Sequence, residues 1–279
     1  MTALAAGFLA GAVWLGALQQ QNAQQQQEEQ QKKAAEEAIE KFKAAYTAAG
    51  ASEDGRTRAV KDLAAVQHRR TAMVLISILA SNELIGVRIS AADALGTFSK
   101  VEGIPAALIA VCQDPPNAKK VDIRKACIRA MGELRAREAV SVLHEIARKK
   151  PYDVAREAVI ALGKVRLRDS IPQLIDVLRE VEKNSDTAEA NPLGGIPSVP
   201  GGPTVGSNLP GTTGSFPGLG GLGGFGGEDD MRREQEERRR LMQEPTVKAL
   251  LSITREKWTT SKEWEIWWRR YGATFVVPK

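Results

Sequence analysis

The chain has 279 residues, of which 43% are hydrophobic and 5% are aromatic, and its formal net charge is +5. This composition is ordinary for a globular protein of one or two domains. Two histidines, His68 and His144, and two cysteines, Cys112 and Cys127, are the only residues of these types. Because neither histidine has a cysteine or a third ligand close by in the chain, the sequence excludes a zinc site of ordinary spacing.

An apolar segment, Ala3–Leu18, opens the chain and contains no charged residue. It is shorter than the roughly 20 residues that a spanning helix needs, and it has the length of the apolar region of a signal peptide. Small residues at Leu15-Gly16-Ala17 suit cleavage, but no Lys or Arg precedes the run. An uncleaved anchor, or a start assigned too far downstream, are therefore alternatives. We expect residues 1–18 to be a signal peptide or N-terminal anchor and the protein to be exported to the periplasm or cell envelope.

A Gln-rich segment, residues 19–35, follows, and it is predicted to be a solvated tether or the polar start of a helix. Farther on, Ile39, Phe42 and Tyr46 recur at helical spacing. This pattern predicts a helix that caps the N-terminal end of a stack of repeats, and we place the capped domain at residues 36–183.

A ten-residue block recurs in that domain, as Val87–Gly96, Ile123–Gly132 and Val154–Gly163, with a looser copy ending at Ala64. Its last residues are 32, 36 and 31 positions apart, and a second apolar run follows each copy. Periods of this length are typical of stacked helical units, which build surfaces rather than catalytic pockets. We read each unit as a block helix, a turn and a second helix, with the glycine as a helix C-cap. Pro105 and Pro172 are predicted in the first turn of the second helix.

These blocks resemble the HEAT-repeat family, specifically the short bacterial repeats also found in phycobilin lyases, over about residues 54–183. The resemblance implies an all-α solenoid of about four helical-hairpin repeats. It also implies binding or scaffolding as the first function to consider, and a lyase-like or isomerase-like accessory enzyme as the alternative.

Basic residues recur in the turn that follows each block. Residues 51–183 contain 23 Lys or Arg against 17 Asp or Glu. Stacking is expected to align the turns into a basic ridge that attracts anionic surfaces or polymers, although exposed turns carry Lys and Arg in any case. We call the ridge residues the turn ridge: Arg69, Arg70, Lys100, Arg135, Arg137, Arg166 and Arg168. Arg56, Arg88 and Arg124 recur elsewhere, and we interpret them as structural contacts between repeats, with Asp54, Asp93 or Asp122 as partners.

The segment 184–244 has low complexity at first, since residues 191–227 hold 14 of the 25 glycines and 6 of the 13 prolines. Ordering such a segment costs backbone entropy with little apolar burial in return, so we predict a flexible linker followed by a charged helix.

A Trp-rich helical hairpin is predicted over residues 245–279, with its first helix opened by Pro245. Thr260 and Glu263 have the spacing of a capping box. The helix after them places Trp264, Trp267 and Trp268 on one face. This tail resembles the Trp-x-x-Trp-Trp endings of secreted HEAT proteins from planctomycete-like bacteria. An exposed face of this kind is rarely tolerated, so we expect it to dock on the last repeat or to bind a partner.

Neither cysteine has the histidine partner that nucleophilic catalysis requires, and a disulfide between them is left open. No phosphate-binding loop or paired catalytic carboxylates are evident. We predict a non-enzymatic protein-interaction scaffold that needs no cofactor. Its candidate partner-binding residues are the turn ridge and the three tryptophans. Nucleic acid is an unfavoured partner, because no aromatic residues alternate with the ridge, and membrane contact is expected only through an uncleaved N-terminal segment.

Overall fold

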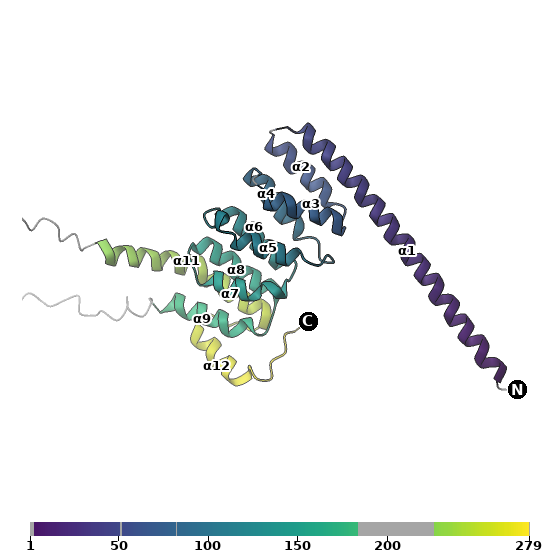
Figure 1. Ribbon diagram of the computed structural model, residues 1–279. Helices are drawn as coiled ribbons and strands as arrows, with labels where there is room; N and C mark the ends of the chain where they lie inside the picture. The colour runs from purple at the N-terminus through teal and green to yellow at the C-terminus, as the bar shows by residue number, and fades with distance from the viewer. Residues whose placement is uncertain (1–2, 51, 82, 184–225, 279) are drawn as a thin grey trace, which may run out of the picture.

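The computed structural model describes residues 3–50, 52–81, 83–183 and 226–278. These residues form α-helices and two 3-10 helices, without a strand among them. The helices are α1 (Ala3–Ala48), α2 (Glu53–Ala64), α3 (Arg69–Ala80), α4 (Ile85–Leu95), α5 (Ile104–Gln113), η1 (Pro115–Asn117), α6 (Val121–Glu133), η2 (Arg137–Ala139), α7 (Val140–Ala147), α8 (Tyr152–Val165), α9 (Ser170–Glu182), α11 (Gly226–Thr254) and α12 (Ser261–Tyr271). The all-helical repeat solenoid predicted from the sequence is confirmed, and Figure 1 shows the helices stacked in chain order.

Two layers of helices make up the stack. The helices that carry the repeated block, α2, α4, α6, α8 and α11, pack directly against one another and form the block layer. The other layer contains α1, α3, α5, α7, α9 and α12, which we call the partner layer. The core lies between the layers, where the first, fifth and ninth residues of the three glycine-ending blocks are buried, as Val87, Ala91 and Leu95 are in α4.

The extensive pairings join a partner-layer helix to the block helix that follows it: α1 with α2, α3 with α4, α5 with α6, α7 with α8, and α9 with α11. Our sequence interpretation paired each block helix with the helix after it, as α4 with α5, but these helices contact each other little. That interpretation was wrong by one helix. The physical reason is that a repeating sequence determines the period of a stack but not the point at which one packed unit ends.

The closing glycines determine how closely the block helices approach. A Cβ atom at Gly132 would lie 3.0 Å from the Cα of Ala161, and one at Gly163 would lie 3.0 Å from the Cα of Ala249. Gly96 meets Ala130 in the same way. We expected these glycines to be helix C-caps, and Gly96 is the C-cap of α4, with right-handed helical angles. Gly132 and Gly163, in contrast, lie inside α6 and α8. Their function is close backbone packing rather than helix termination.

The same contact shows that the second half of α11 is a fifth copy of the block. Ala249 occupies the place of Ala130 and Ala161, and the residues in register with the buried block positions, Met242, Thr246 and Leu250, are all buried. Pro245 lies inside this helix and does not open it, contrary to our prediction. The charged first part of α11 contacts α8 and α9 through Tyr152 and Glu180. The solenoid therefore continues beyond residue 183, while the Gly/Pro segment 184–225 lies outside the described residues.

At the other end of the stack, the C-terminal part of α1 packs against α2 and α3. Ala35 and Phe42 are buried there, and Phe42 also contacts Tyr46 at a ring-centroid distance of 5.0 Å. Figure 1 shows the N-terminal part of α1 projecting away from the stack. None of the described helices is long and apolar enough to cross a membrane.

The recurring arginines at the start of the block helices connect neighbouring helices, as we expected, but not through the aspartates we named. Arg88 is buried and donates from Nε to Leu79 O at 2.8 Å and from Nη2 to Asn117 Oδ1 at 3.0 Å. Arg56 forms an ion pair with Glu83 at 2.6 Å. Arg88 joins the end of α3 to α4, and Arg56 joins α2 to the segment that follows α3. Both side chains therefore connect neighbouring units of the stack.

Candidate interaction surface

The turn ridge lies along one edge of the stack, where each block helix leads into the next partner-layer helix. Arg69 and Arg70 begin α3, Lys100 lies between α4 and α5, Arg135 and Arg137 lie between α6 and α7, and Arg166 and Arg168 lie between α8 and α9. The connections α3–α4, α5–α6 and α7–α8 lie at the opposite edge. The two edges therefore differ in the residues that they expose.

Two neighbouring turns of the ridge enclose a groove of about 700 Å³, which we call the ridge groove. One side comes from residues 98–105, including Lys100 and Glu102, and the other from residues 134–138, including Arg135, Arg137 and Glu138. Lys100, Arg135 and Arg137 are exposed. Among the described residues, no hydrogen bond or ion pair involves the side chains of these three.

Three of the other ridge arginines contact other parts of the chain. Arg70 forms an ion pair with Glu36 of α1. Arg166 donates from Nη2 to Pro278 O at 2.7 Å, and Arg168 donates from Nη2 to Gly272 O and, at 3.0 Å, to Ala273 O. The non-helical residues after α12 therefore lie over the last ridge turn, so the open part of the ridge is centred on the ridge groove.

The tryptophan face of α12 is packed inside the molecule. Trp264 is fully buried and Trp267 nearly so, with a ring-centroid distance of 5.7 Å in an edge-to-face arrangement. Trp264 Nε1 donates to Trp258 O at 3.1 Å, so its polar atom is satisfied. Trp268 is partly buried, with the Arg168 guanidinium 5.8 Å from its ring centroid. This face docks α12 onto α9 and is not available as a binding anchor.

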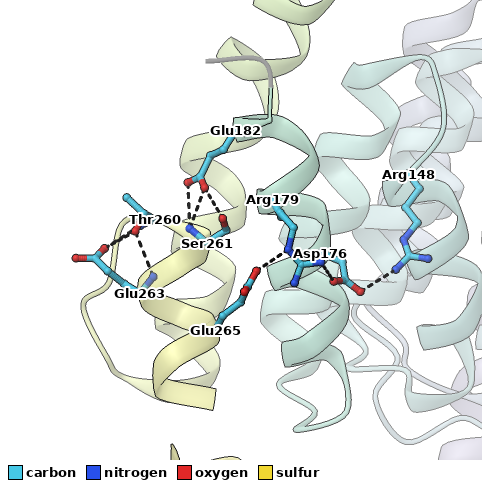
Figure 2. A network of polar contacts seen from close by, with 8 residues as sticks. All are labelled: Arg148, Asp176, Arg179, Glu182, Thr260, Ser261, Glu263 and Glu265. Carbon is cyan, nitrogen blue, oxygen red and sulfur yellow. Dashed lines mark hydrogen bonds and ion pairs between the residues drawn. The ribbon is translucent and has the colours of Figure 1, made fainter. Parts of the chain in front are cut away.

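Figure 2 shows a polar network across the partner layer that sequence reasoning missed. Arg148, after α7, lies 3.7 Å from Asp176 of α9, which also pairs with Arg179 at 2.8 Å. Arg179 Nε then reaches Glu265 of α12 at 2.5 Å. The spacing of Asp176 and Arg179 within α9 is visible in the sequence, but the partners on α7 and α12 come from packing.

The start of α12 is held by two carboxylates. Glu182 accepts from the Ser261 backbone N–H at 3.0 Å (Figure 2). The predicted capping box is present, since Thr260 Oγ1 accepts from Glu263 N and the Glu263 carboxylate accepts from Thr260 N at 3.0 Å. Hydrogen bonds from the Thr260 hydroxyl and backbone lower the pKa of Glu263. The Glu263 carboxylate lies near the positive end of the helix dipole, which favours its charged form.

The two histidines lie at the start of α3 and on α7, where their surroundings are those of structural residues. His68 is the N-cap of α3, and its Nδ1 accepts from Arg70 N at 3.1 Å. His144 lies on α7, and burial, together with the nearby Arg148, lowers its pKa. Within the part of the chain that the structure describes, no group of three His, Cys, Asp or Glu side chains could hold a metal ion.

Both cysteines are free thiols and are buried, Cys112 in α5 and Cys127 in α6. Burial raises the pKa of Cys127 to about 12 and also raises that of Cys112. Since the thiolate is the reactive form, both side chains are core residues rather than nucleophiles at neutral pH.

One comparison with known proteins gives a match within the repeat stack. Residues 106–190 match the family model of HEAT repeats. The match covers most of α5 and all of α6–α9, so this part of the stack is similar to HEAT repeats. No curated protein and no solved structure matches the chain significantly.

Proposed function

We propose that this protein is a non-enzymatic scaffold of the cell envelope that binds a protein partner through the turn ridge. HEAT repeats are commonly protein-interaction scaffolds, and the helix stack presents its turns on a continuous packed core. The observation that carries the proposal is the ridge groove. Its three exposed cations lie together on one edge, while the equivalent arginines of the next turn already hold a segment of polypeptide.

A protein partner fits this edge better than an anionic polymer or membrane surface does. Glu102 and Glu138 line the same groove as Lys100, Arg135 and Arg137, so the groove alternates in charge. A polymer of phosphates or sulfates would be repelled by these carboxylates, whereas a polypeptide can offer both donors and acceptors. A lyase-like enzyme is supported only by likeness of fold, which does not determine chemistry.

Site-specific photo-crosslinking in the native host tests the proposal. A benzophenone amino acid is placed at Lys100 or at Arg137 on the ridge, and at Lys119 on the opposite edge as the matched exposed control. We expect both ridge positions to give the same discrete adduct, identified by mass spectrometry, and Lys119 not to give it. The same adduct from Lys119, or none from either ridge position, would reject the ridge as the binding surface.

A further inference from the structure

The chain supplies its own example of how a ridge turn holds polypeptide. Residues 272–278, after α12, form no helix beyond a turn, and their main-chain oxygens accept hydrogen bonds from Arg166 and Arg168. Phe275 packs on Trp267 with a ring-centroid distance of 5.2 Å. Because both arginines donate to carbonyl groups, this part of the recognition reads the main chain rather than side chains.

The same two arginines recur one turn earlier in the stack. Arg135 and Arg166 each follow their closing glycine by three residues, and Arg137 and Arg168 follow it by five. Arg135 has φ 51° and Arg166 has φ 55°, the left-handed region that arginine rarely adopts. The two turns therefore share an unusual backbone, and their guanidinium groups start from equivalent positions.

The earlier turn differs in what lies over it. Arg166 and Arg168 are covered by residues 272–278, whereas Arg135 and Arg137 border the open ridge groove, opposite Lys100. The volume of about 700 Å³ is sufficient for a short peptide segment. Glu102 and Glu138 in the groove can accept from peptide N–H groups.

We propose that the ridge groove binds an extended segment of a protein partner, whose main-chain carbonyls accept hydrogen bonds from Arg135 and Arg137. Lys100, on the facing wall, favours an acidic side chain in that segment. This inference rests on the proposed scaffold function and adds to it the ligand class, a non-helical acidic peptide, and the residues that hold it.

The test uses the full-length chain and a phage-displayed library of random dodecapeptides. Panning is expected to enrich peptides rich in Asp and Glu that bind the full-length chain. In Arg135→Ala/Arg137→Ala their affinity should fall at least tenfold. The melting temperature of this variant should stay unchanged, because both side chains are exposed and because alanine has the same backbone φ and ψ preferences as arginine.

Two further variants make the outcome decisive. Arg69→Ala, an exposed ridge arginine outside the groove, should leave peptide affinity unchanged. Arg135→Lys/Arg137→Lys keeps the positive charge but removes the forked guanidinium donors. The enriched peptides should therefore bind this variant more weakly, while any binding of heparin should be unchanged.

Failure to enrich peptides, or enriched peptides that bind Arg135→Ala/Arg137→Ala equally well, would overturn the inference. If heparin binds in a way that depends on both arginines and no peptide binds, the ligand of the ridge groove is a polyanion and the inference is overturned. The crosslinking result above is independent of either outcome.

Discussion

Single residues determine the spacing of the block layer. Glycine normally weakens a helix by about 0.5–1 kcal/mol relative to alanine, yet Gly132 and Gly163 lie inside α6 and α8. They are used there because any side chain would meet the backbone of the next block helix at about van der Waals contact or closer. Close packing of backbone on backbone outweighs the local helix propensity.

Replacing Gly132 by leucine tests this account. Leucine is a good helix former, so a loss of stability would come from overpacking against Ala161, which costs about 1–3 kcal/mol. The matched control is Ala110→Leu on the exposed face of α5, where space is open. Chemical denaturation should show a lower unfolding free energy for Gly132→Leu than for Ala110→Leu. Equal stabilities would mean that the glycine contact is not limiting.

His144 makes the stability depend on pH. Burial lowers its pKa in the folded state, and its Nε2 is buried without a hydrogen-bond partner in the described structure. As pH falls below the unfolded value of about 6.5, the unfolded chain takes up a proton that the folded chain resists, so folding stability decreases. The melting temperature should fall between pH 7.5 and 5.5, and by less in His144→Gln. An identical fall in the variant would assign the effect to other groups.

Single helices determine how the two ends of the stack are covered. α12 extends the partner layer beyond α9 and buries Trp264 and Trp267, while α1 packs against α2 and α3 at the other end. The polar network Arg148–Asp176–Arg179–Glu265 lies mainly at the surface, and exposed ion pairs contribute little. Docking of α12 therefore depends on apolar burial, and the network orients the helix.

Replacing two tryptophans of the C-terminal segment, one buried and one partly exposed, tests whether the burial of α12 stabilises the stack. Trp264→Ala removes a fully buried ring and should cost roughly 3–5 kcal/mol of unfolding free energy. Trp258 is 37% exposed and uses only its backbone oxygen to accept from Trp264, so Trp258→Ala should cost much less. Comparison of the two denaturation midpoints checks this. Similar midpoints would show that α12 does not stabilise the stack.

The apolar N-terminal segment carries the proposal of export. Ala3–Leu18 contains no charge, and glutamines follow directly. In the native host we expect the protein outside the cytoplasm, with a mature N-terminus near Ala17–Ala23 if the segment is cleaved. N-terminal sequencing of each cell fraction measures this. A soluble cytoplasmic chain that retains Met1 would contradict export.

At the scale of the whole molecule, the residues of the turn ridge lie in two different surroundings. Arg166 and Arg168 hold the chain's own residues 272–278, whereas Lys100, Arg135 and Arg137 face an open groove. The sequence repeat makes these arginines equivalent, but only the last turn of the row is next to the C-terminal segment. Position in the stack therefore decides which turns are structural and which are available for binding.

Charge reversal at the two turns should accordingly have different effects. Arg166→Glu/Arg168→Glu removes the hydrogen bonds to Pro278 and Ala273 and should lower the melting temperature. Arg135→Glu/Arg137→Glu should leave it nearly unchanged, since surface changes usually alter stability by about 0.5 kcal/mol or less. If the ridge binds a partner, the second variant should bind more weakly, and raised salt should weaken binding to the unaltered chain. Equal melting temperatures would show that the contacts of residues 272–278 contribute no stability.

The sequence alone determined the helical class, the period of the repeat, the exposed basic turns and the capping box at Thr260. Each of these depends on local propensity or on periodicity within one segment, which the order of residues encodes directly. The tertiary structure decided the pairing of helices, the glycine contacts and the fifth block helix. A periodic sequence does not show which neighbouring helices pair with each other. The block Met242–Leu251 lacks the closing glycine, so it is recognised only from its burial in the structure. The tertiary structure also decided which ridge arginines stay uncovered. Residues 272–278 lie more than 100 residues from Arg166 and Arg168 in the chain, and they contact these arginines only because α12 packs on α9.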